Sequence, residues 1–190
     1  FNCITNYFPP TSGNVFFEGK EITGIKPHKI TELGITRTFQ HTQVFPQLTV
    51  YDNVVTGQYV IKQKDAHRSK AKMDADVENI LDLVGLNSYR EMIASNLSMG
   101  DQTRLAIGIA LATEAKLLLL DEPAAGMNPE ETKQLMNLLR KVREHGVTIV
   151  LIEHDMKAVM GICERIVVLE YGQKIAEGTP EEIRQNPQVI

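Results

Sequence analysis

The sequence has few cysteines, no long apolar run and no excess of positive charge. Its two cysteines, Cys3 and Cys163, form no CxxC pair, which excludes a disulfide framework and a zinc site and fits a reducing environment. No apolar run approaches the roughly 18 residues of a membrane span, so we expect membrane contact only through a partner. Twenty Lys and Arg against 24 Asp and Glu give a net charge of -4, which argues against direct nucleic-acid binding.

What remains is the composition of an ordinary globular chain. Its 190 residues are 43% hydrophobic and 23% charged, enough for one domain or for a core with a subdomain. The first residues lack the basic and apolar regions of a signal peptide.

Two short apolar segments end abruptly in polar residues. Leu117–Leu120 runs into Asp121 and Glu122, and Ile149–Ile152 is followed by Glu153 and His154. Such runs are typical of buried strands whose carboxyl ends open on a crevice. The intervening segment predicts a helix, since Asn128 can cap it, proline suits its first position and two acids follow. Strand, helix and strand predict parallel neighbours whose polar ends share one sheet edge.

A helical block interrupts this alternation. Before the block we predict a hairpin at 14–22, a helix at 27–33 ended by Gly34, and a strand at 35–40. The block at 41–96 includes a helix capped by Thr49 and another at 73–84, ended by Gly85. A helix at 155–163, two strands at 165–177 and a helix begun by the capping box of Thr179 follow His154.

The polar residues at the strand ends suit nucleotide hydrolysis. Asp121 can hold Mg²⁺ through water, and Glu122 can orient or deprotonate an attacking water. His154 can bond a γ-phosphate, and Gln40, at a third strand end, can contact the metal and the attacking water. Taken singly, each residue also has a structural interpretation, because polar groups commonly end buried strands.

A further polar cluster lies at residues 96–104. Ser98, Gly100 and the polar residues after them open a predicted helix, where backbone N–H groups and the helix dipole can bind an anion. By itself this is equally an ordinary helix cap. The chain order Gln40, Ser98, Asp121, Glu122, His154 makes coincidence a poor explanation.

The chain resembles the nucleotide-binding subunits of ABC transporters. The local sequences of its motifs are most similar to those of the ATP-binding subunits of branched-chain amino acid importers. The resemblance covers essentially the whole chain. The matching segments are Thr38-Phe39-Gln40 (Q-loop), Leu97-Ser98-Met99-Gly100-Asp101-Gln102 (signature motif), Leu117 to Pro123 (Walker B strand), Ala124 to Pro129 (D-loop) and Glu153-His154-Asp155-Met156 (switch histidine).

The resemblance implies a P-loop NTPase (RecA-like) core with an inserted helical subdomain, working as a homo- or heterodimer with ATP and Mg²⁺. Asp121 and Gln40 would serve the metal, while Glu122 would be the catalytic carboxylate and His154 the γ-phosphate sensor. Asp101 and Gln102 would join Ser98 and Gly100 in contacting ATP held by the partner subunit. Gln40 and the segment 44–50 would couple the cassette to transmembrane permease subunits, at the cytoplasmic face of the membrane.

One motif of the family, the loop G-x-x-x-x-G-K-[ST], is missing from these residues. We therefore expect an α/β core that is truncated at its N-terminus. It would consist of residues 1–40 and 101–190 and lack the first strand and the P-loop. Residues 41–100 would form the helical subdomain that ends in the signature loop.

The helix after the signature motif also departs from the family. Residues 105–110 are Leu-Ala-Ile-Gly-Ile-Ala, where the family usually has a Glu and an Arg. We expect Gly108 to cost about 0.5–1 kcal/mol relative to alanine. Two alternatives stay open: a non-transport ABC ATPase, and a truncated module that binds or regulates without catalysis.

We predict that a polypeptide of residues 1–190 alone does not hydrolyse ATP, although a longer form with the loop does. Charged phosphate contacts contribute roughly 1.5–3 kcal/mol each, so loss of the loop should remove measurable ATP affinity from this polypeptide. A Mg-ATP titration with intact-mass measurement checks this. Robust turnover at the mass of residues 1–190 would contradict it.

Overall fold

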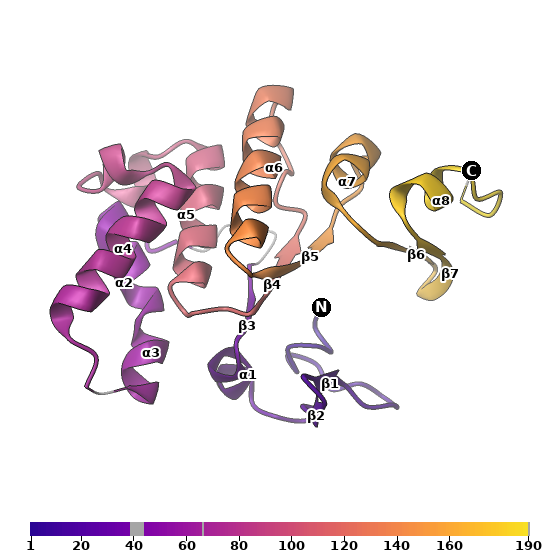
Figure 1. Ribbon diagram of the computed structural model, residues 1–190, viewed down its shortest axis with the longest axis horizontal. Helices are drawn as coiled ribbons and strands as arrows, with labels where there is room; N and C mark the ends of the chain where they lie inside the picture. Colours follow the sequence, from indigo (N-terminus) through magenta and orange to yellow (C-terminus); the bar gives the residue numbers. More distant parts are fainter. Residues whose placement is uncertain (39–43, 66, 190) are drawn as a thin grey trace. The chain divides into compact units, whose positions relative to one another are not determined.

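The computed structural model describes residues 1–38, 44–65 and 67–189. Two compact units divide the chain at Ile152, with Phe1–Ile152 in the first and Glu153–Ile190 in the second (Figure 1). Gln40, predicted at a strand end, lies outside the described residues.

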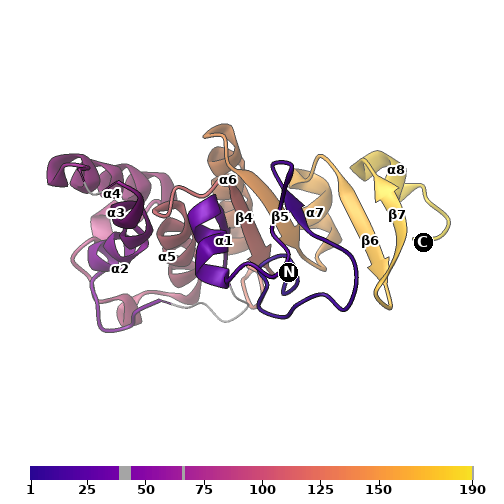
Figure 2. The same ribbon diagram turned by 90° about the horizontal axis from the view of Figure 1, so that it is seen from below.

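A parallel sheet organises the first unit. In the described residues it consists of β3 (Ile35–Arg37), β4 (Leu117–Asp121) and β5 (Thr148–Ile152), with β4 in the middle. Figure 2 shows β4 and β5 side by side. Leu119 pairs with Arg37 on one side and Val150 on the other, and Asp121 pairs with Ile152. The predicted parallel pairing of the two apolar segments is therefore confirmed.

The two apolar segments differ in burial. Leu118, Leu119 and Leu120 of β4 are fully buried, as their unbroken apolar run predicts. Val150 and Ile152 of β5 remain 40% and 41% exposed, although their sequence is as apolar. In the part of the chain that the structure describes, β5 pairs with β4 alone.

Helix α6 (Pro129–Glu144) connects β4 to β5 with the predicted start. The Asn128 side chain accepts from the N–H groups of Glu130 and Glu131, and the Asn128 N–H donates to Glu131 Oε2 at 2.9 Å, which completes a capping box. The helix buries one apolar face, made of Leu135, Met136, Leu138, Leu139 and Val142. It thereby fixes where the chain re-enters the sheet.

The segment before β3 also folds as predicted. The hairpin strands β1 (Phe16–Phe17) and β2 (Lys20–Glu21) pair antiparallel, and α1 (Pro27–Leu33) ends at Gly34, which adopts the left-handed conformation with φ 103°. Ahead of them, residues 1–7 form turns in which the Thr5 N–H donates to the Phe1 carbonyl oxygen at 3.0 Å.

Helices make up most of the chain between β3 and β4. They are α2 (Val50–Gly57), α3 (Tyr59–Lys64), α4 (Lys70–Val84) and α5 (Met99–Leu111), with 3₁₀ turns at Asn87–Tyr89 and Ala94–Asn96. Thr49 caps α2 as predicted. The prediction that α4 starts at Met73 is wrong by three residues, because Ser69 caps it by accepting from the Lys72 N–H.

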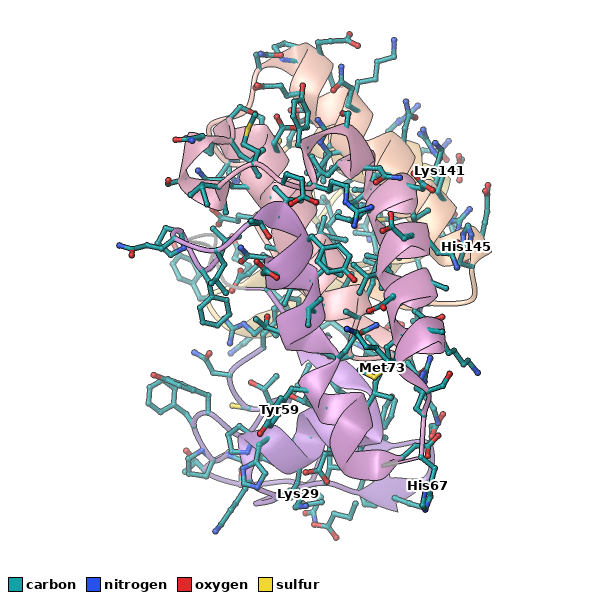
Figure 3. The ribbon with its side chains drawn as sticks, turned by 90° about the vertical axis from the view of Figure 1, so that its left-hand side faces the viewer. Lys29, Tyr59, His67, Met73, Lys141 and His145 are labelled. Carbon is teal, nitrogen blue, oxygen red and sulfur yellow. The ribbon has the colours of Figure 1, made fainter. Side chains whose placement is uncertain are left out.

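These helices pack on one another around α5. Helices α2 and α4 both contact α5 and each other. Figure 3 looks onto this side of the molecule, with Tyr59 labelled on α3 and Met73 on α4. No helix among the described residues has the length and apolar character that crossing a membrane requires. The proposed division into 1–40 with 101–190 and 41–100 stays a prediction.

The second unit has a small core of its own. It contains α7 (Met156–Ile162), the antiparallel strands β6 (Ile166–Glu170) and β7 (Gln173–Gly178), and α8 (Pro180–Arg184). The predicted capping box at Thr179 is present. The core cluster of this unit consists of Val159, Ile166, Ala176 and Ile183.

Two helical glycines at the α2, α4 and α5 contacts predict opposite effects of alanine. A Cβ at Gly57 would lie 2.3 Å from the Ile109 carbonyl oxygen and 2.8 Å from the Ala112 Cβ, whereas a Cβ at Gly108 would meet Ile80 at 3.4 Å, an ordinary contact. Gly57→Ala should lower the free energy of unfolding by about 1–3 kcal/mol. Gly108→Ala should raise it by about 0.5–1 kcal/mol.

Urea unfolding of both variants beside the wild type measures the two changes. Each variant adds one methyl group inside a helix, so each serves as the control for the other. Equal effects of the two substitutions would contradict this account of the helix packing.

Candidate functional site

The carboxyl end of β4 holds two acids in a constrained geometry. Asp121 is the last residue of the strand, and the next N–H, that of Glu122, donates to the Ile152 carbonyl oxygen at 2.9 Å. Glu122 adopts a left-handed backbone with φ 46°. This conformation is uncommon for a residue with a side chain and costs about 1–2 kcal/mol. The catalytic role predicted for Glu122 stays a prediction.

Arg37 gives Asp121 a fixed positive neighbour. An Nη2–H of Arg37 donates to Asp121 Oδ2 at 2.8 Å, and an Nη1–H donates to Asn2 Oδ1 at 2.5 Å. The guanidinium also lies 5.7 Å from the centre of the Phe1 ring. Sequence reasoning assigns Arg37 no role. Arg37 ends a strand that neighbours the Walker B strand, and this position could have identified it as a candidate site residue.

The signature segment lies at the start of α5. Ser98 is the N-cap: its Oγ accepts from the Asp101 N–H at 3.1 Å and donates to Asp101 Oδ2 at 2.9 Å. The Gln102 side chain donates to the Leu97 carbonyl oxygen at 3.1 Å. Ser98, Gly100, Asp101 and Gln102 are thus brought together, as the sequence predicts, on the first turn of one helix.

Arg104 balances the acid in this turn. Its Nη2 pairs with Asp101 Oδ1, and its Nη1 reaches the Val84 carbonyl oxygen at the end of α4 at 3.5 Å. The signature turn is therefore tied to the neighbouring helix through one guanidinium. A hollow of about 220 Å³ opens beside this turn. Its lining is Ser98, Gly100, Asp101, Arg104, Met127, Glu131, Gln134 and Leu135.

The fold itself does not require a glycine at position 100. Gly100 is helical, and a Cβ there would meet only Glu131, at 3.7 Å or more. A side chain would fit within this chain and would favour the helix. The contact predicted between Gly100 and a nucleotide stays a prediction.

The remaining predicted residues are not placed against these two clusters. Gln40 lies outside the described residues. His154 is an exposed residue of the second unit, next to Asp155, whose side chain caps α7 by accepting from the Lys157 N–H at 2.8 Å. The predicted meeting of His154 with Asp121 and Glu122 stays a prediction.

The residues present suit Mg²⁺ bound with phosphates rather than alone. Among the described residues, no group of three or more His, Cys, Asp or Glu could hold a metal by itself. Mg²⁺ is commonly bound through one or two carboxylates, with water and substrate phosphates completing its shell. The half-buried Asp121 carboxylate, 24% exposed, fits that mode.

A parallel sheet with acids beyond its central strand, and a serine-capped helix nearby in the chain, define an α/β nucleotide-binding cassette. The sequence profile of the ABC transporter family matches residues 1–125. A second profile, described as branched-chain amino acid ATP-binding cassette transporter, matches residues 173–190.

Relatives and solved structures agree with the profiles. Over 201 residues, the chain is 40% identical to the high-affinity branched-chain amino acid transport ATP-binding protein LivG of Escherichia coli K12, covering all of this chain and 79% of LivG. For BraF of Pseudomonas aeruginosa the identity is 41% with the same coverage. The ADP conformation of an ABC transporter's ATP-binding cassette has a TM-score of 0.86 and 30% identity, covering 99% of this chain and 79% of that one.

The chain therefore belongs to the ABC transporter family, as one of its ATP-binding cassettes. The predicted α/β fold of that class is confirmed. Proteins of this class bind ATP.

The left-handed backbone of Glu122 predicts an unusual order of stability between two variants. Glu122→Gly and Glu122→Ala both delete the side chain, but only glycine adopts φ 46° without strain. The glycine variant should have a free energy of unfolding about 1–2 kcal/mol higher than the alanine variant.

Urea unfolding of the two variants measures this difference. Glu114 has a similar left-handed backbone, with φ 56°, so Glu114→Gly and Glu114→Ala form a matched pair outside the site. An alanine variant as stable as the glycine variant at position 122 would contradict the presence of strain.

Proposed function

We propose that this chain is the ATP-binding and ATP-hydrolysing subunit of an importer for branched-chain or related amino acids. The observation that carries the proposal is the pair Asp121 and Glu122 at the carboxyl end of a buried central strand. The full-length similarity to LivG and BraF, whose names specify branched-chain amino acid transport, supports the substrate class.

At the sheet edge, each acid has a separate task. Asp121, together with Gln40, would hold Mg²⁺, which when bound would neutralise charge on the ATP phosphates. Glu122 would accept a proton from the attacking water or orient it. His154 would bond the γ-phosphate. The position of Glu122 directly after the strand, with its N–H bonded to the Ile152 carbonyl oxygen at 2.9 Å, supports this assignment.

The signature turn would act on ATP held by a second subunit. Helix α5 is 13 residues long, and the N-terminus of such a helix attracts phosphate through its N–H groups and dipole. Ser98, Gly100, Asp101 and Gln102 would form this surface. The Ser98 hydroxyl hydrogen is shared with Asp101, so contact with a phosphate requires it to turn from that carboxylate.

Permease subunits would contact residues 44–50, the segment that leads into α2. Phe45 and Leu48 there are 53% and 37% exposed, which suits contact with an apolar partner surface. Membrane association at the cytoplasmic face would then depend on these subunits, and the partner cassette would be a second copy or a related chain.

One pair of substitutions tests the shared ATP site. In a form of the protein that binds Mg-ATP, Glu122→Gln should stop turnover and leave an ATP-bound dimer. Adding Gly100→Ala to that variant should abolish the dimer, because a methyl group blocks close approach of the phosphate, while the free energy of unfolding does not fall.

Light scattering with and without Mg-ATP measures the dimer, and Gly108→Ala, inside the same helix, is the matched control. A Gly100→Ala variant that still forms the dimer would argue against the role of the signature turn. Unchanged steady-state turnover in Glu122→Gln would argue against Glu122 as the catalytic carboxylate.

A further inference from the structure

Arg37 holds a position that hydrolysis of ATP does not by itself explain. Its guanidinium approaches Asp121 from the neighbouring strand β3, and the two residues are 84 positions apart in the sequence. The Arg37 side chain is 12% exposed and that of Asp121 is 24% exposed. A pair that is this shielded from water interacts more strongly than an ion pair on the open surface.

The guanidinium is held by more than the carboxylate. Asn2 Oδ1 accepts from Nη1 at 2.5 Å, while the Phe1 ring lies beside the same group. Arg37 thus has contacts of its own that do not depend on the Asp121 carboxylate. Because arginine cannot lose its proton in proteins, it is a permanent positive charge at this sheet edge.

We propose that Arg37 is a positioning residue that acts as the resident counter-ion of Asp121 and makes divalent-cation binding there depend on ATP. The inference rests on the proposed function, in that Asp121 is taken as a metal-binding residue. In the free protein, Arg37 engages Asp121 Oδ2 and offsets its charge, so a divalent cation arriving alone meets a carboxylate that is already paired. The phosphates of ATP supply the missing negative charge, and the cation then binds with them.

The proposal makes a prediction about MgCl₂ without nucleotide. In Arg37→Gln, the Asp121 carboxylate loses its counter-ion, so in EDTA the variant should unfold at a temperature at least about 3 °C below the wild type. MgCl₂ should restore at least half of this loss, with a half-saturating concentration about tenfold below that of any wild-type response. The wild type should respond little.

Two further variants complete the test. Asp121→Asn removes the carboxylate, and the double variant removes both charges, so the double variant should show no response to MgCl₂. In EDTA, the double-mutant cycle should give a coupling of about tenfold in the unfolding equilibrium constant. KCl at equal ionic strength controls for screening.

Lys116→Gln is the matched control for losing a cation near this sheet. Lys116 pairs with Glu18 at 2.8 Å, and both side chains are more than half exposed. MgCl₂ should not rescue this variant. Should Arg37→Gln fail to fold in EDTA, recovery of folded protein when it is prepared in MgCl₂ carries the same meaning.

The outcomes separate the inference from the proposed function. Equal destabilisation of Arg37→Gln in EDTA and in MgCl₂ would overturn the inference and leave Arg37 a structural role alone. If Asp121→Asn also leaves the Mg²⁺ dependence of ATP binding unchanged, in a form that binds ATP, the metal role of Asp121 fails as well. If MgCl₂ raises the unfolding temperature of Arg37→Gln but not that of the double variant, the result supports both the inference and the metal role of Asp121.

Discussion

The burial of β4 is the constraint on which the rest of this structure depends. Leu118, Leu119 and Leu120 have no exposed surface, and β3 and β5 flank the strand on its two edges. Charged groups cannot be accommodated along such a strand without a large desolvation cost. The first acids can therefore stand only at its carboxyl end, which is where Asp121 and Glu122 lie. Burial of the strand thus places both acids together at one edge of the sheet.

In each cluster of candidate site residues, an arginine pairs with one of the acids. Arg37 faces Asp121 at the sheet edge, and Arg104 faces Asp101 in the signature turn. Each arginine also reaches a second segment, Asn2 in one case and the end of α4 in the other. In both clusters, the arginine that pairs with the acid also connects it to a second segment of the chain. Polyanionic phosphates are expected to rearrange these pairs when they bind, since they compete for the same guanidinium and hydroxyl groups.

Stability and function compete at some of these positions and coincide at others. Glu122 adopts a left-handed backbone that costs stability, and Gly100 lacks a helix-favouring side chain for which the chain has room. Ser98, in contrast, serves the fold as a helix cap and remains suited to bind phosphate. Gly57 is purely structural, because α5 passes too close to it for any side chain.

The sequence alone determined the parallel strands, the helix caps at Asn128 and Thr179, the glycine stops and the placement of Ser98 and Asp121. These features follow from neighbours within a few positions, where hydrogen-bonding rules and apolar patterns act directly. It missed the start of α4 at Lys70, and it gave no sign that β5 is more exposed than β4. Only the tertiary structure decided the Arg37 to Asp121 pair, the Arg104 link to α4 and the close approach at Gly57. Each of these joins segments far apart in the chain, and such contacts depend on how whole elements pack.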